Sequence, residues 1–267
     1  TRRNRRIGLG VMGWADMLVK LRVPYDSETG MALGERVMEF VQGEARNHSS
    51  ELAKTRGKFP NWEHSAYARE NIAMRNATVT TVAPTGTISI IAGCSSGIEP
   101  YYAVAFERNI MEGTRLAEVN PIFEGMAKRD GFYSEELMVE IAHRRSIQEL
   151  EGIPEEVRAV FLTAADITPE DHIRMQAQFQ KHCDSSVSKT INFPETATRE
   201  AVRTAFLMAY REGLKGITIY RDNSRPNQVL SSRRQAAGSV EGQAPVVAER
   251  PAVLSGITEQ IRTGYGN

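Results

Sequence analysis

The chain has 267 residues, of which 41% are hydrophobic and 25% are charged, as in an ordinary globular protein. Its 33 basic and 33 acidic side chains cancel, so no overall charge draws the chain to nucleic acid or to an anionic membrane. No apolar run approaches the roughly 18–20 residues that a membrane-spanning helix needs. We therefore expect neither a membrane nor a nucleic-acid partner.

The N-terminal part is expected to be mainly helical. Apolar residues at helical spacing predict three helices, at about residues 7–22, 28–54 and 63–74. Asp26 or Ser27 is the expected N-cap of the second helix. The stretch "ATVTTVA" (77–83) is short and rich in β-branched residues, which is typical of a strand buried on both faces.

Strands and helices alternate further along the chain. Helices are expected at about 120–130, 134–143, 154–163 and 169–182, and from Thr198 as N-cap to Gly213. Strands are expected in "AVAFERNI" (103–110), "SVSKTINF" (186–193) and "GITIYRD" (216–222). This alternation predicts an α/β fold with a mostly parallel sheet.

We expect one folded part over residues 1–230. The sequence that follows is rich in Ser, Gly, Ala, Pro and Gln without periodicity, which predicts a flexible linker over 231–255. Residues 256–267 begin a new periodic segment, which we interpret as the start of a truncated C-terminal module. Because the first residue is not Met, we interpret the chain as the interior of a longer protein.

The stretch "GLGVMG" has glycines at the spacing of a dinucleotide-binding motif, at Gly8, Gly10 and Gly13. That motif works only between a strand and a helix, where the pyrophosphate meets the helix N-terminus. Here the polar "TRRNRR" precedes it, which does not predict a strand. We interpret the glycines as positions where a helix packs closely.

The stretch "TVAPTGTISIIAG" (81–93) places small and hydroxyl residues between two apolar runs. Pro84 ends a strand ladder because it lacks an N–H, and Gly86 allows close approach of a ligand. If a helix starts here, the N–H groups of Thr85 to Ser89 and the hydroxyls of Thr85, Thr87 and Ser89 form an anion-binding cradle. A β-hairpin with a small turn fits the same residues equally well.

No other stretch has the spacing of a known site. There is no G-x-x-x-x-G-K-[ST] motif. The five histidines show no metal-ligand spacing, so no metal site is expected; they are His48, His64, His143, His172 and His182. Two cysteines, Cys94 and Cys183, are too few for a disulfide framework and are interpreted as buried structural thiols.

Four longer stretches resemble one family. They are "RRIGLGVMGWADML" (5–18), "RNATVTTVAPTGTISIIAGCSSGIEP" (75–100), "DHIRMQAQFQKHCDSSVSKTINFP" (171–194) and "GLKGITIYRDNSR" (213–225). Together they resemble the catalytic chain of the adenosylcobalamin-dependent, class II ribonucleotide reductases. The resemblance covers roughly residues 5–225.

The resemblance implies an α/β barrel of ten strands, of which this chain would form mainly the second, parallel half. It also implies that Pro84, Thr85, Gly86, Thr87, Ile88 and Ser89 bind the phosphates of the substrate. The following segment, Cys94, Ser95, Ser96, Gly97, Ile98 and Glu99, would shape the floor of the same pocket.

The class also follows from the resemblance. Two-subunit reductases of this family carry adjacent tyrosines in the strand that matches "KGITIY", and here Thr218 and Ile219 stand at those positions. Without that radical relay, homolysis of adenosylcobalamin would supply the radical, with contacts that the sequence does not place. The implied reaction reduces a ribonucleoside diphosphate to the 2′-deoxyribonucleotide.

The family's thiyl-radical cysteine and its two reducing cysteines lie before the region that matches residue 1. Neither Cys94 nor Cys183 is in such a motif, so no catalytic residue is assigned in this chain and the isolated chain is expected to be inactive. Its unpaired sheet edges predict poor solubility. Asn223 replaces a family glycine in a turn, where Asn tolerates left-handed geometry.

The implied partners are the ribonucleoside diphosphate, the N-terminal half of the same enzyme and an external dithiol such as thioredoxin, and the implied location is the cytoplasm. Two alternatives remain open. One is a stand-alone nucleotide- or phosphate-binding α/β module, and the other is a purely structural piece of a split protein.

Overall fold

The computed structural model describes residues 2–109 and 115–224, so the expected linker and C-terminal module (231–255 and 256–267) lie outside the described residues. The helices are α1 Trp14–Lys20, α2 Glu28–Arg56, α3 Ala66–Arg69, α4 Gly86–Ala92, α5 Pro121–Asp130, α6 Glu135–Ala142, α7 Glu155–Val160, α8 Pro169–Lys181 and α9 Arg199–Arg211, with a 3₁₀ turn η1 at Trp62–His64. The strands are β1 Ala105–Asn109, β2 Arg115–Val119, β3 Thr190–Phe193 and β4 Thr218–Arg221.

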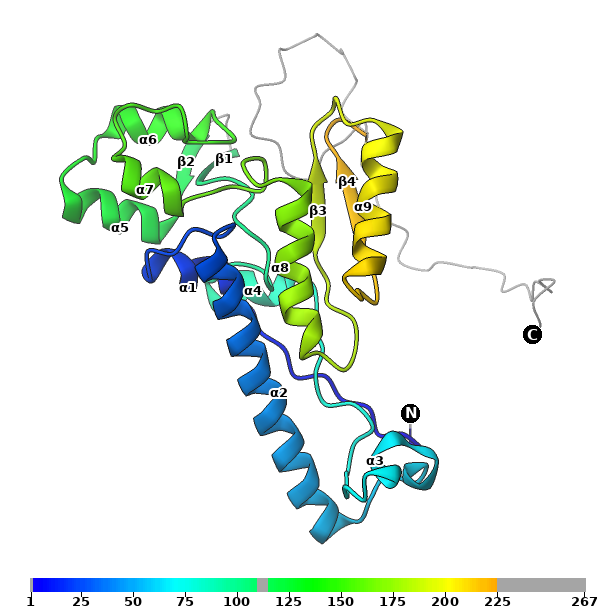
Figure 1. The fold of residues 1–267 in the computed structure, drawn as a ribbon. Helices are drawn as coiled ribbons and strands as arrows, with labels where there is room; N and C mark the ends of the chain where they lie inside the picture. The colour runs from blue at the N-terminus through cyan, green and yellow to red at the C-terminus, as the bar shows by residue number, and fades with distance from the viewer. Residues whose placement is uncertain (1, 110–114, 225–267) are drawn as a thin grey trace, which may run out of the picture. The chain divides into compact units, whose positions relative to one another are not determined.

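Parallel strands form the centre of the fold. β3 and β4 lie side by side in parallel (Figure 1), with Thr190 opposite Thr218. Two extended segments add to them through parallel bridges, Val82 with Val187 and Leu9 with Thr80. The order across the sheet is therefore 7–10, 78–83, 187–193 and 218–221, which confirms the predicted α/β fold with parallel strands.

The predicted helix over 7–22 is wrong in its first half, because residues 7–10 are extended and α1 begins only at Trp14. The Leu9 N–H donates to the Val79 carbonyl at 2.7 Å, and the Thr81 N–H donates back to Leu9 at 3.0 Å. A Cβ on Gly10 would lie 2.0 Å from the Thr81 carbonyl oxygen. Gly8 and Gly10 thus let a strand approach its neighbour, so the interpretation that they pack a helix is wrong, whereas Gly13 is the N-cap of α1 with φ 80°.

Helices cover the sheet where the apolar spacing predicts them. α8 packs against α2, β3 and α9, and the Trp14 and Phe179 rings meet edge to face at 5.0 Å. Ser27 is the N-cap of α2, since its hydroxyl accepts the Gly30 N–H at 3.0 Å. Thr198 caps α9 in the same way, as predicted. The helix expected at 63–74 is shorter and consists only of η1 and α3.

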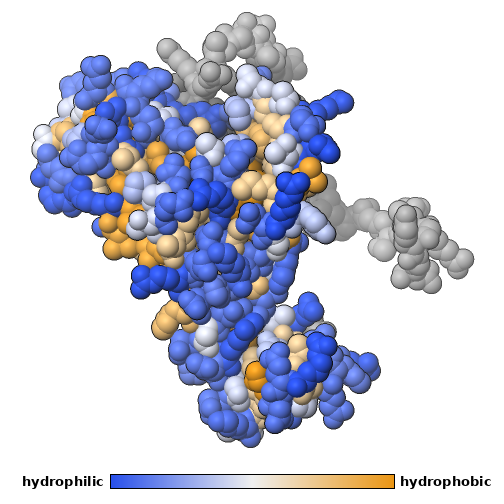
Figure 2. Space-filling model, viewed as in Figure 1, coloured by the Kyte–Doolittle hydropathy of each residue, from blue (hydrophilic) through white to orange (hydrophobic). Residues whose placement is uncertain are grey.

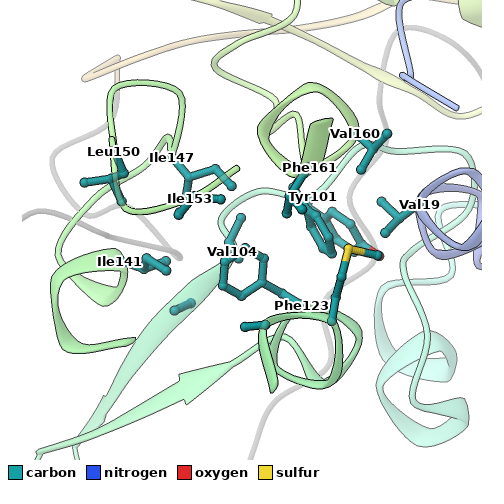
Figure 3. Packing of buried hydrophobic residues seen from close by; sticks show 14 of the residues in the cluster. Val19, Tyr101, Val104, Phe123, Ile141, Ile147, Leu150, Ile153, Val160 and Phe161 are labelled. Carbon is teal, nitrogen blue, oxygen red and sulfur yellow. The ribbon is translucent and has the colours of Figure 1, made fainter. Parts of the chain in front are cut away.

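A second core lies among α5, α6, α7 and the β1–β2 hairpin. The expected strand at 103–110 is present as β1, but its partner β2 runs antiparallel to it and was not predicted. Phe123 and Phe161 are fully buried and meet edge to face at 5.0 Å (Figure 3). Tyr101 stacks on Phe161 in the same cluster, so the segment before β1 is anchored there.

The face drawn in Figure 2 is mostly hydrophilic, with hydrophobic residues in separate patches. Of the described helices, none combines the length and apolar character needed to cross a membrane.

Candidate phosphate-binding site

The segment after the strand 78–83 forms a helix start and not a hairpin. Thr85 adopts a left-handed conformation with φ 53° and α4 begins at the next residue. The Thr85 carbonyl accepts the Ser89 N–H at 2.9 Å. Within the described chain, the N–H groups of Gly86, Thr87 and Ile88 have no acceptor, as expected for the first turn of a helix.

These three N–H groups belong to exposed residues. Pro84, Gly86, Thr87 and Ile88 are exposed and Thr85 is half-buried. A Cβ added to Gly86 would meet nothing within 4 Å, so the space in front of this residue is open. The structure therefore leaves room for a ligand beside the unpaired N–H groups.

Ser89 differs from the other loop residues because it is buried, with 1% of its surface exposed. Its hydroxyl lies 2.7 Å from the Ser96 hydroxyl and 3.3 Å from the Gly86 carbonyl. With its N–H bonded to Thr85 as well, Ser89 fixes the shape of the loop from behind.

The loop carries no charge. Residues 84–93 contain no acidic or basic side chain. An anion bound here would be held by neutral N–H and hydroxyl donors and by the positive end of a short helix.

The segment Ser95–Glu99, which we call the brace, packs against the loop and forms hydrogen bonds with it. Ser96 bonds to Ser89 as described, and the Gly97 N–H donates to the Thr85 hydroxyl at 2.7 Å. Ile98 is fully buried, and its carbonyl accepts the Tyr25 hydroxyl at 2.6 Å. The half-buried Cys94 precedes the brace as a free thiol.

The two ends of the brace are fixed by carboxylates. The Ser95 N–H donates to Asp16 Oδ2 of α1 at 2.9 Å. At the other end, Glu99 Oε1 accepts the Thr190 N–H at 2.6 Å and Oε2 accepts Lys189 Nζ at 2.9 Å. The brace thereby joins the loop at Pro84–Ser89 to α1 and to β3.

Lys189 is fully buried and has three partners. Besides Glu99, its Nζ contacts the Thr190 carbonyl at 3.1 Å and His172 Nδ1 at 2.8 Å. Burial lowers the Lys189 pKa, and the charge of Glu99 opposes that shift. Burial and then the charge of Lys189 lower the His172 pKa to about 2, so the imidazole is neutral. A proton on Nε2, facing the Ala164 carbonyl at 3.2 Å, fits both contacts of the ring.

A hollow of about 440 Å³ lies next to the loop. Its walls are Thr81–Pro84, Ser186–Ser188 and Gly216–Thr218. Of the residues proposed from the sequence, only Pro84 lines this hollow, and none of Cys94–Glu99 does. Over the described residues, no group of three or more His, Cys, Asp or Glu side chains could hold a metal ion.

The comparisons with known proteins agree with this fold. A family model described as "Ribonucleotide reductase, barrel domain" matches residues 1–220. The chain belongs to this family. A vitamin B12-dependent ribonucleoside-diphosphate reductase of Thermoplasma acidophilum is 51% identical over 92% of this chain and 31% of its own length. One from Mycobacterium tuberculosis is also 51% identical, over 86% of this chain and 33% of its own length.

Among solved structures, the alpha subunit of a class Id ribonucleotide reductase from Actinobacillus ureae matches with a TM-score of 0.71 and 28% identity. The match covers 83% of this chain and 40% of that one. The chain thus spans about a third of the length of its curated relatives.

From its residues alone, the segment 84–89 was equally consistent with a helix start and a hairpin turn, and the residues that hold it in the structure were not predicted. Asp16, Tyr25 and Lys189 were not candidates, although each bonds to the brace. The one available signal was Asp16, an acidic residue within an apolar run.

Proposed function

We propose that this chain is part of a ribonucleoside-diphosphate reductase and supplies the loop that binds the phosphates of the substrate. The observation that carries the proposal is the set of three unpaired N–H groups at Gly86, Thr87 and Ile88, next to open space. The loop follows the carboxyl end of a parallel strand, which is where α/β folds bind ligands. The proposed reaction, reduction of a ribonucleoside diphosphate, rests on the family and on the names of the relatives.

In this proposal the loop binds the phosphates of the substrate and thereby orients the substrate. The N–H groups of Gly86, Thr87 and Ile88 donate to phosphate oxygens, and the hydroxyls of Thr85 and Thr87 add donors. Pro84 ends the strand, and Ser89 holds the loop closed from behind. The segment Cys94–Glu99 supports the pocket through the contacts of the brace.

No catalytic residue is assigned to the chain. Burial raises the pKa of the Cys183 thiol, which disfavours the reactive thiolate. The radical and reducing cysteines would be supplied by the N-terminal half of the same enzyme. An external dithiol such as thioredoxin would restore them, in the cytoplasm.

Adenosylcobalamin, when bound, would supply the initiating radical. His172, an imidazole that could in principle ligate cobalt, is fully buried with both ring nitrogens engaged. We therefore assign no cobalamin contact to this chain.

The test is the conversion of CDP to dCDP by this chain together with the N-terminal half, with adenosylcobalamin and dithiothreitol. We compare the wild type with Gly86→Leu, because a side chain there enters open space and leaves the fold intact. We expect at least a tenfold rise in KM, about 1.4 kcal/mol of lost binding. Gly43→Leu is the matched control, since Gly43 is exposed on α2 and a Cβ there also meets nothing within 4 Å.

Normal turnover by Gly86→Leu would overturn the loop assignment. Tight nucleotide binding by the chain alone would favour a stand-alone phosphate-binding module. Activity of the chain alone would show that its own cysteines act in catalysis. Normal assembly of the mixture with no change of affinity in Gly86→Leu would favour a purely structural role.

A further inference from the structure

We propose that Asp16 is a positioning residue for the phosphate loop and acts on it through the brace. This inference rests on the proposed function of the loop. Asp16 is on α1, about seventy residues before the loop in sequence, and is only 9% exposed. It contacts the brace and none of the loop residues among its described hydrogen bonds.

Asp16 binds the first residue of the brace from two sides. Its carboxylate Oδ2 accepts the Ser95 N–H at 2.9 Å, and its own N–H donates to the Ser95 hydroxyl at 3.3 Å. The start of α1 adds a further bond, from the Gly13 N–H to the Ser95 carbonyl at 2.7 Å. The position of Ser95 is therefore set by α1.

Tyr101, which follows the brace in sequence, binds the second oxygen of the Asp16 carboxylate. Its hydroxyl donates to Asp16 Oδ1 at 2.5 Å. Burial, followed by the hydrogen bond that the hydroxyl donates to Asp16, raises the Tyr101 pKa, so the hydroxyl keeps its proton and remains a donor. Both oxygens of Asp16 thus accept charge-assisted hydrogen bonds, which are stronger than neutral ones.

The next two residues of the brace pass this constraint to the loop. Ser96 bonds to the buried hydroxyl of Ser89, and Gly97 donates to the hydroxyl of Thr85. Gly97 has φ 46°, and a Cβ there would lie 3.2 Å from the Ala83 carbonyl oxygen. The brace therefore fits closely against both the entry of the loop and its first helical turn.

Thr85 is the residue on which the direction of the free N–H groups depends. Its left-handed conformation turns the chain from the strand into α4, and such a conformation is uncommon for a β-branched residue. Because the Gly97 N–H holds the Thr85 hydroxyl, a shift of the brace would let this turn relax. The N–H groups of Gly86, Thr87 and Ile88 would then lose their common direction, without any change in the loop sequence.

Asp16→Asn tests this chain of contacts with little change of volume. An amide can accept from only one of the two donors, and its NH₂ group then faces the other donor. We expect KM for CDP to rise about tenfold while kcat changes by less than about threefold, as for lost substrate binding. We also expect faster amide exchange in residues 85–93 without substrate.

Asp184→Asn is the matched control. Asp184 is also a largely buried carboxylate that accepts a backbone N–H, from Val79 at 2.7 Å, together with Arg46 at 2.8 Å. It lies at the beginning of the strand 78–83, whereas the loop follows the end of that strand. We expect lower stability of Asp184→Asn with an unchanged KM.

All variants are measured in the chain assembled with the N-terminal half. An equal KM in Asp16→Asn and wild type, or equal rises in Asp16→Asn and Asp184→Asn, would overturn the positioning role. If Asp16→Asn does not fold, Tyr101→Phe removes one donor only and should raise KM about threefold; an unchanged KM there would overturn the inference. A normal KM in Gly86→Leu would instead refute the loop assignment itself.

Discussion

The loop region (Pro84–Glu99) and the α5–α7 region place their apolar side chains in opposite ways. In the α5–α7 region Phe123, Ile141 and Phe161 are fully buried. In α4 the side chains of Ile90 and Ile91 are 79% and 82% exposed, while the polar Ser89 is buried. The α5–α7 region is held together by apolar packing, whereas α4 and the turn before it keep their shape through hydrogen bonds to the brace.

This difference shows how a segment with little core of its own can still have a defined shape. The loop region is fixed at several points by bonds to residues far away in sequence, at Asp16, Tyr25 and Lys189. Such buried polar bonds are costly to leave incomplete, so each one specifies the position of its partner. We therefore expect substitutions in the two regions to differ in kind as well as in size.

The largest effect is expected from Phe123→Ala in the α5–α7 region. The variant leaves a cavity beside Phe161 and should lower the free energy of unfolding by about 3–5 kcal/mol. Urea denaturation of the assembled protein measures this loss. A loss below about 1 kcal/mol would show that this core is not closely packed and would remove the contrast between the two regions.

An intermediate effect on the free energy of unfolding is expected from pH. It acts through His172, which contacts the Lys189 that binds Glu99 of the brace. Its pKa in the folded protein is about 2, well below the ordinary value of 6.5, because of burial and of Lys189. As the pH falls, His172 therefore takes up a proton in the unfolded chain before it does so in the folded protein. The stability that the neutral His172 contributes is fully present above about pH 6.5 and is lost as the pH falls toward 2. We expect a loss of about 1–2 kcal/mol between pH 7.5 and pH 5 from this residue.

His172→Gln provides the comparison for that measurement. Its urea unfolding at pH 7.5 and pH 5 should show a smaller dependence on pH than the wild type does. If the free energy of unfolding depends on pH equally in the two proteins, His172 takes up its proton as readily in the folded protein as in the unfolded chain. That result would contradict its contacts with Lys189 and Ala164.

The smallest effect is expected from Ile91→Ser in α4. Because this side chain is 82% exposed, the free energy of unfolding should change by no more than about 0.5 kcal/mol. Thermal denaturation of the assembled protein measures it. A loss above about 2 kcal/mol would mean that another part of the assembled protein covers Ile91, and the contrast would then apply only to the chain by itself.

The sequence was sufficient where local patterns decide the structure. The helices after residue 120 were predicted from apolar spacing, and the structure shows that Asn120, Ser134 and Thr168 cap three of them. The parallel strands at 186–193 and 216–222 follow from short apolar runs between helices, and their pairing agrees with the expected fold.

The sequence was insufficient where distant residues decide. The start of "GLGVMG", around Leu9, is extended because the strand 78–83 lies beside it, which nothing within the six residues indicates. In the same way, the partners of the brace lie 73 to 91 positions away in sequence, at Asp16, Tyr25, Lys189 and Thr190. The location of the loop could be predicted, but the contacts that hold it could not.

The three free donors at the start of α4 belong to the backbone, and every residue type except proline carries the same N–H group. Mutation of Thr87 or Ile88 to most other residues would therefore preserve these donors. What the donors require is the path of the chain, which depends on the turn at Thr85 and on the buried residues that hold it.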